Sequence, residues 1–244
     1  MSGVIADPAQ IKALKLATIT PTLPKAILVE EFNRILISRV TLPGASRGIT
    51  AFVEKDDLLP FEEAKLYGHN AVHALIGYLA QLRGLRVMSE AAADPVIMKI
   101  ARAAFIEESG GALTRRHARL GDPLFTPGGY RAYAEDLLDR MTRATLNDLV
   151  ARICRDPARK LGYDDRFYGT MRVALEQGIQ PVNLAMGAAA ALIAHAGPAR
   201  AGQPLPAADI LASLWGSQPS PDADTLVALT AAGLRDLGKS GFIC

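Results

Sequence analysis

Cysteine is scarce in this 244-residue chain, which contains only Cys154 and Cys244. Two cysteines are too few for a disulfide framework or a thiolate zinc site, so the composition favours a reducing, cytoplasmic location. Residues 1–10 lack the basic start and the apolar stretch of a signal peptide. The most apolar run, residues 184–194, is shorter than the roughly 20 residues that span a bilayer. It therefore predicts a buried helix, and no membrane is expected as a partner.

A strong charge of either sign is also absent, because 27 basic residues face 25 acidic ones and the net charge is +2. Aromatic residues make up only 6% of the chain, and few of them interleave with basic residues as in a single-strand binding surface. Nucleic acid is therefore not an expected partner. No G-x-G-x-x-G motif follows a predicted strand, which argues against a complete dinucleotide-binding fold in this chain.

Helical periodicity, in contrast, is abundant. Apolar residues make up 50% of the chain and recur at helical spacing between proline and glycine breaks. Several prolines follow a capping or turn residue and so mark helix starts, as Asp94-Pro95 and Thr126-Pro127 do. We expect an all-α, multi-helix bundle with helices near residues 60–83, 95–117, 127–142, 145–154, 165–177, 181–196 and 222–238, and a short one near 206–215.

The N-terminal quarter of the chain has a different pattern. Residues 26–29 and 35–40 are rich in β-branched side chains, and Pro43, Gly44 and Gly48 interrupt the sequence before a further apolar run. Such a mixture predicts one helix and a short strand or two within residues 18–56. The chain is therefore expected to consist of a short mixed segment, residues 1–56, and a helical domain, residues 57–244.

The segment from Phe61 to His73 carries the first candidate site, just inside a predicted helix start. At about 100° per residue, Lys65, Asn70 and His73 fall at roughly 0°, 140° and 80°, within one face of that helix. Two simpler interpretations remain open. A helical lysine among apolar residues is often a solvated surface residue, and the four-residue spacing of His69 and His73 is one that can hold zinc, although no third ligand is evident.

The spacing of these three residues resembles the signature of the long-chain mannitol dehydrogenase family: a lysine, then four residues and an asparagine, then two residues and a histidine. Three further segments look like the same family and lie in the same order: residues 29–33 (VEEFN), residues 105–109 (FIEES) and residues 152–161 (RICRDPARKL). The resemblance runs from about residue 26 to residue 197. It implies a helical fold similar to the C-terminal domain of 6-phosphogluconate dehydrogenase-like enzymes.

The same resemblance implies a metal-independent, NAD-dependent oxidation of a secondary alcohol. Lys65 would take the hydroxyl proton, which a lysine does near neutral pH only where burial and neighbouring positive charge favour its neutral form. Asn70 would donate its amide to the reacting oxygen, and His73 would orient the substrate or Lys65. The expected function is the substrate-binding and catalytic domain of a polyol or polyol-phosphate dehydrogenase of the mannitol-1-phosphate/fructose-6-phosphate type.

A second candidate site is the basic segment around Asp156-Pro157, which we expect to be a loop. The resemblance implies that Arg152 and Lys160 contact the polyol hydroxyls. Arg155 or Arg159 would then hold a phosphate, because the planar guanidinium binds phosphate with two hydrogen bonds. The alternative is a solvated loop in which these cations pair with nearby aspartates. A hexuronate reductase, which would bind a carboxylate here, also stays open.

The chain departs from the family at its N-terminal end. Only 28 residues precede the segment that begins at Val29, where family members have a whole dinucleotide-binding domain. Residues 1–56 would then be the tail end of that domain, and we expect no activity unless a separate Rossmann-type chain supplies NAD. We therefore expect the chain to be a fragment, half of a split enzyme or a remnant. If it is a remnant, the expected function is a non-catalytic helical interaction or oligomerisation module that uses the helices at 181–196 and 222–238.

Overall fold

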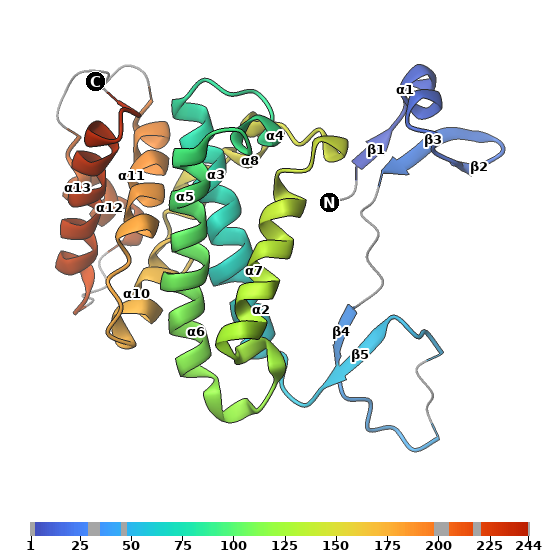
Figure 1. Cartoon of the computed structure of the whole chain (residues 1–244), viewed down its shortest axis with the longest axis horizontal. Coiled ribbons are helices and arrows are strands. Elements are labelled where there is room, and N and C mark those ends of the chain that lie inside the picture. The colour runs from blue at the N-terminus through green and yellow to red at the C-terminus, as the bar shows by residue number, and fades with distance from the viewer. Residues whose placement is uncertain (1–2, 29–34, 45–47, 198–204, 217–220, 244) are drawn as a thin grey trace. The chain divides into compact units, whose positions relative to one another are not determined.

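The computed structural model describes residues 3–28, 35–44, 48–197, 205–216 and 221–243. The chain divides into two compact units after Leu58, two residues beyond the boundary expected from the sequence. The first unit contains short strands and one helix, and the second is helical (Figure 1). The segment at residues 29–33 that resembles the mannitol dehydrogenase family lies outside the described residues.

The N-terminal unit contains two small sheets. Strand β3 (Leu23–Leu28) pairs antiparallel with β1 (Gly3–Ile5) and β2 (Thr18–Thr20), and α1 (Pro8–Ala13) lies between β1 and β2 in the chain. Strand β4 (Ile35–Ser38) pairs with β5 (Phe52–Lys55) in parallel. The prediction of one helix and a strand or two was wrong, since the described part of residues 18–56 has four strands and no helix. The strands are short and mostly solvent-exposed, so they lack the apolar alternation that identifies a strand in a sequence.

Two long helices dominate the second unit, and each contains a π-helical segment. Residues 59–82 run through α2 (Leu59–Glu63), η1 (Ala64–Asn70) and α3 (Ala71–Leu82). Residues 95–116 run through α5 (Pro95–Arg102), η2 (Ala103–Ser109) and α6 (Gly110–Arg116). Both helices were predicted to within a residue, and the all-α fold of this unit is confirmed. The π segments were not predicted, because local spacing does not identify them.

The remaining helices also follow the prediction, with additions. They are α4 (Met88–Ala91), η3 (Ala118–Leu120), η4 (Pro123–Phe125), α7 (Pro127–Met141), η5 (Ala144–Leu146), α8 (Val150–Ile153), α9 (Pro157–Lys160), α10 (Tyr168–Glu176), α11 (Val182–Ala196), α12 (Ala207–Trp215) and α13 (Ala223–Lys239). The helix predicted over residues 145–154 was wrong in its first half. There Asn147 adopts a left-handed conformation with φ of 45°, and Leu149 forms an antiparallel bridge with Val87.

Capping side chains explain where several of these helices begin. Asp94 accepts hydrogen bonds from the backbone N–H groups of Val96 and Ile97, at 2.9 and 3.1 Å. The Thr126 hydroxyl accepts one from Gly129 N–H at 3.0 Å. Each cap satisfies backbone donors that the first helical turn leaves unpaired, and the following proline fits that turn because it has no N–H.

Helix α3 forms the centre of the core, since every residue from Ala71 to Ala80 is buried. It packs against α11, which in turn lies beside α13 (Figure 1). A Cβ on Gly233 of α13 would come within 2.4 Å of the Ala185 carbonyl oxygen, so these two helices approach as closely as only glycine allows. The run at residues 184–194 is a mostly buried helix, as predicted. No helix in the described part of the chain is both long and apolar enough to cross a membrane.

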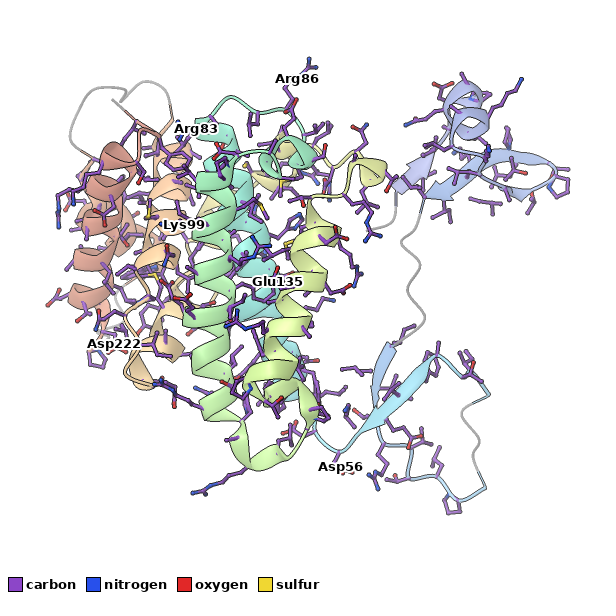
Figure 2. The ribbon with its side chains drawn as sticks, in the orientation of Figure 1. Asp56, Arg83, Arg86, Lys99, Glu135 and Asp222 are labelled. Carbon is purple, nitrogen blue, oxygen red and sulfur yellow. The ribbon has the colours of Figure 1, made fainter. Side chains whose placement is uncertain are left out.

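At the surface, α7 is joined to the helix that begins with α5. Arg102 donates three hydrogen bonds to Glu135, from Nε to Oε1 at 2.8 Å and to Oε2 at 3.1 Å, and from Nη2 to Oε2 at 2.8 Å. Glu135, which extends from α7, is labelled in Figure 2. The pairing holds the pKa of Glu135 below its usual value, and the hydrogen bonds from Arg102 are the main cause.

Candidate active site

Lys65 and Asn70 mark the first and last turns of the π-helical segment η1. In a π-helix the backbone hydrogen bond runs from residue i to residue i+5, so residues five apart take the neighbouring places that residues four apart take in an α-helix. Lys65 and Asn70 are five apart. The π segment therefore aligns them more closely than the offset of about 140° expected for an ideal α-helix.

Contacts with η2 hold η1 in place. A Cβ built on Gly68 would lie 2.4 Å from the Tyr130 hydroxyl and 2.8 Å from the Phe105 ring, so only glycine fits there. Tyr130 is also hydrogen-bonded to Ser109, with 3.1 Å between the two hydroxyl oxygens. Phe105 and Ser109 belong to the second segment that resembles the family. The two segments thus pack on each other, and both are π-helical, a geometry frequent at functional sites.

The Lys65 side chain is exposed, and its ammonium makes no hydrogen bond or ion pair with any described residue. The burial that would favour a neutral lysine is therefore not provided by the described residues of the helical unit. Asn70 is half-buried at the junction with α3. The described contacts do not join Lys65 to Arg152 or to Lys160.

His73 is buried on α3 and lies close to the basic segment. Its Nε2 lies 3.5 Å from Oδ2 of Asp148. The other oxygen of Asp148 accepts hydrogen bonds from Arg152, from Nε at 2.7 Å and also from Nη2. Asp148 therefore bridges His73 and Arg152, which are far apart in the sequence. The His69 and His73 rings meet edge to face at 6.0 Å, and no group of three or more His, Cys, Asp or Glu side chains within the described ranges could hold a metal ion.

Lys160 is almost fully buried, with 5% of its surface exposed. Its Nζ donates to the Arg155 carbonyl and lies 5.9 Å from the centroid of the Tyr78 ring, on the same helix as His73. Burial lowers the pKa of Lys160, and the positive charges of Arg166 and Arg159 add to this effect. The Tyr78 hydroxyl donates to the Cys154 carbonyl at 3.3 Å, which ties the basic segment to α3.

Comparison with known proteins identifies the family to which this chain belongs. Residues 57–232 match the family model described as the mannitol dehydrogenase C-terminal domain. The chain belongs to the mannitol dehydrogenase family. Its fold is similar to that of a Pseudomonas fluorescens mannitol 2-dehydrogenase solved as a ternary complex with NAD and D-mannitol, with a TM-score of 0.57 and 21% identity. That match covers 79% of this chain and 41% of the other chain, so this chain spans less than half the length of that mannitol 2-dehydrogenase.

The basic segment of this mannitol dehydrogenase domain was predicted to be a loop, and that prediction was wrong for residues 152–153 and 157–160, which are helical, while residues 154–156 and 161–166 are not. Residues 157–160 form the one-turn helix α9, which Asp156 begins from a left-handed conformation with φ of 55°. Arg159 is paired with Asp156 at 2.9 Å and reaches Asp165 at 3.5 Å. Arg155 has no carboxylate partner among the described residues. The local pairing expected in the simpler interpretation thus applies to Arg159 and not to Arg155.

Two buried carboxylates were missed in the sequence. Asp148 precedes Arg152 by four residues, and that spacing was the available signal, because an acidic and a basic residue four apart face each other on a helix. Glu108 lies in η2 with 3% of its surface exposed. Its oxygens accept from the backbone N–H groups of Asn183 at 2.7 Å and Leu184 at 2.9 Å, so it caps α11 from a distant part of the chain. No local sequence pattern predicts that contact.

The sequence from Gly233 to Ser240 (GLRDLGKS) matches the G-x-x-x-x-G-K-S pattern of phosphate-binding loops. The structure places residues 223–239 in the continuous helix α13. Lys239 is paired with Asp236 at 2.8 Å. A phosphate-binding loop needs free backbone N–H groups in a turn between a strand and a helix, so the match is coincidental.

Proposed function

We propose that this chain is the substrate-binding and proton-handling domain of a metal-independent, NAD-dependent polyol or polyol-phosphate dehydrogenase. The observation that carries the proposal is the bridge from His73 through Asp148 to Arg152. It joins the lysine motif, through His73, to the basic segment, through Arg152, and these two segments are far apart in the sequence. A polyol carries several hydroxyl groups in a row, and a buried imidazole beside a guanidinium provides an acceptor and donors for them.

In this proposal Lys65 takes the proton of the reacting hydroxyl, and the Asn70 amide donates to the oxygen that gains charge. His73, Arg152 and Lys160 bind the remaining hydroxyls. Lys65 is exposed in this chain, so the proposal requires a second surface that covers η1 and desolvates the ammonium. A Rossmann-type domain that also holds the nucleotide is the proposed partner.

NAD is part of the proposal through the family and not through a site among the described residues. The described residues contain no Gly-rich strand-to-helix turn, and their sheets are an antiparallel set of three strands and a separate parallel pair. These residues therefore do not fit the dinucleotide, and the roles proposed here concern the polyol alone. Within the polyol class we favour a phosphorylated substrate, because Arg155 has no carboxylate partner among the described residues and a phosphate suits its guanidinium.

The exposure of Lys65 favours a second candidate, a non-catalytic interaction module. The helices first considered for that role are α11 and α13, and they pack closely on each other inside this unit. Their apolar surface is largely used internally, which makes them weak candidates for binding a partner. We therefore rank catalysis above interaction.

The test combines the full chain with a dinucleotide-binding domain of a family member and follows NADH oxidation with fructose or fructose 6-phosphate. Lys65→Ala should lower turnover by about 10²–10⁴-fold, the usual contribution of a positioned general base. Lys99→Ala, an exposed lysine on α5 (Figure 2), is the matched control and should leave turnover unchanged. Equal turnover of the Lys65 variant and the control would favour the interaction module.

A further inference from the structure

Asp148 divides its two carboxylate oxygens between the two candidate substrate-binding residues. Oδ1 accepts from Nε and Nη2 of Arg152, and Oδ2 faces Nε2 of His73 at 3.5 Å. The side chains of Asp148 and His73 are only 7% and 11% exposed. A buried carboxylate with this pattern fixes the direction of both neighbours, because each has a preferred position relative to its own oxygen.

The charge state of Asp148 decides which nitrogen of His73 carries a proton. Burial alone would raise the pKa of this carboxyl, but the contacts with His73 and Arg152, together with the charge of Arg152, outweigh it and leave the pKa lowered. The ionised carboxylate is an acceptor only. Nε2 is the ring nitrogen of His73 that faces this acceptor, at 3.5 Å, so the carboxylate favours the tautomer with its proton on Nε2 and with Nδ1 as acceptor.

The backbone around Asp148 is held on both sides. Its carbonyl accepts from Met88 N–H at 2.8 Å, and Val150 N–H donates to the Arg86 carbonyl at 3.0 Å. These hydrogen bonds flank the bridge between Val87 and Leu149. The carboxylate therefore extends from an anchored segment and is not a mobile surface group.

We propose that Asp148 is a positioning residue that holds His73 in its Nε2–H tautomer and turns the Arg152 guanidinium, so that Nδ1 of His73 and Nη1 of Arg152 are the atoms offered to adjacent polyol hydroxyls. This inference rests on the proposed function. Nη1 of Arg152 has no hydrogen bond to any residue that the structure describes, in agreement with such a role. Asp148 itself does not touch the substrate.

The deciding measurement is the tautomer of His73 in the full chain, read from side-chain ¹⁵N chemical shifts. The wild type should show the Nε2–H form. Asp148→Asn should lose that preference, because a carboxamide donates as well as accepts. Asp136→Asn is the matched control, since Asp136 also pairs with an arginine four residues later, Arg140, but on the surface of α7. It should keep the wild-type tautomer.

A second variant keeps the inference testable if Asp148→Asn does not fold. Arg152→Gln leaves Asp148 facing His73, so the Nε2–H tautomer should persist. A wild-type ring in the Nδ1–H form, or the same tautomer in wild type and Asp148→Asn, overturns the inference. Neither result depends on the proposed function.

Calorimetry with D-mannitol and D-mannitol 1-phosphate on the same proteins tests the positioning role of Asp148 and the proposed function separately. Asp148→Asn should weaken binding by about ten- to one-hundred-fold, the usual cost of breaking a hydrogen-bonded charge pair, and Asp136→Asn should not change it. A tautomer that follows Asp148 in a protein that binds neither ligand, even with the dinucleotide-binding domain added, supports the role of Asp148 in holding His73 and overturns the proposed function. Unchanged binding in Asp148→Asn overturns the positioning role.

Discussion

Candidate site residues lie on the helix of residues 59–82 and in the basic segment of residues 152–166. Different interactions fix the positions of their side chains in the two regions. On the helix, each polar side chain points where the backbone hydrogen-bonding pattern directs it, including the π-helical turn between Lys65 and Asn70. In the basic segment, side chains lie where groups of another element meet them, as Arg152 meets His73 of α3 through Asp148 and Lys160 lies over the Tyr78 ring of α3. The first kind of placement follows from sequence spacing, and the second follows from three-dimensional neighbours.

The two lysines make the contrast clear. Lys65, the proposed base, is exposed on η1, whereas Lys160 is buried with its ammonium against the Arg155 carbonyl. Only Lys160 experiences the desolvation that a basic lysine needs, and burial lowers its pKa. Both side chains extend from helical segments, so helical geometry alone does not determine which of them is buried.

Gly68→Ala gives the strongest test of the helix side of this comparison. The new methyl group would lie 2.4 Å from the Tyr130 hydroxyl and 2.8 Å from the Phe105 ring, so η1 must move away from η2. We expect a loss of about 3 kcal/mol in the free energy of unfolding, measured by urea denaturation. Gly128→Ala, with nothing within 4 Å in α7, is the control and should be neutral or stabilise by up to about 1 kcal/mol. Similar stabilities would show that the π segment is not held by this contact.

Glu108→Gln tests a buried charge held by backbone donors. Its amide group cannot accept from both Asn183 and Leu184, so one N–H at the start of α11 loses its partner. The expected cost is about 2 kcal/mol. Glu107→Gln, the exposed neighbour, should cost much less.

The difference in stability between this variant and the wild type should also depend on pH. Burial raises the pKa of Glu108 above the usual 4.5, despite its hydrogen bonds to Asn183 and Leu184. The folded chain therefore binds this proton at a higher pH than the unfolded chain does, and this group's contribution to stability falls as the pH rises through the raised pKa. The wild type should gain stability relative to Glu108→Gln as the pH is lowered from neutrality towards 4.5. A constant difference between the two proteins over that range contradicts the raised pKa.

Arg155→Ala and Arg159→Ala sharpen the comparison within the basic segment, with the smallest expected effect. Arg159 is already paired with Asp156, and Arg155 has no such partner among the described residues. If a phosphorylated polyol binds here, the Arg155 variant should weaken its binding about tenfold, or about 1.4 kcal/mol, by calorimetry with D-mannitol 1-phosphate. The Arg159 variant should change it less. Equal losses for D-mannitol and its phosphate would place the phosphate elsewhere.

Much of the helical unit could be predicted because its signals are local. Asp94 and Thr126 cap the helices they precede through hydrogen bonds two or three residues long, so their meaning is independent of the rest of the fold. The short strands β2 and β3 were underestimated because most of their residues are exposed, and a strand with little burial has no apolar alternation. The helix predicted over residues 145–154 failed where Asn147 turns the chain into the bridge with Val87, which is a partner distant in the sequence.

For the candidate site, the sequence by itself determined which side chains share the helix of residues 59–82, because 3.6-residue periodicity and a proline start act over a few residues. The tertiary structure alone decided that Asp148 bridges His73 and Arg152, that Glu108 caps α11, and that Lys160 is buried while Lys65 is exposed. Each of these depends on how far a charge lies from water and from a group on another helix. Packing of elements distant in the chain sets those distances, and no local pattern encodes them.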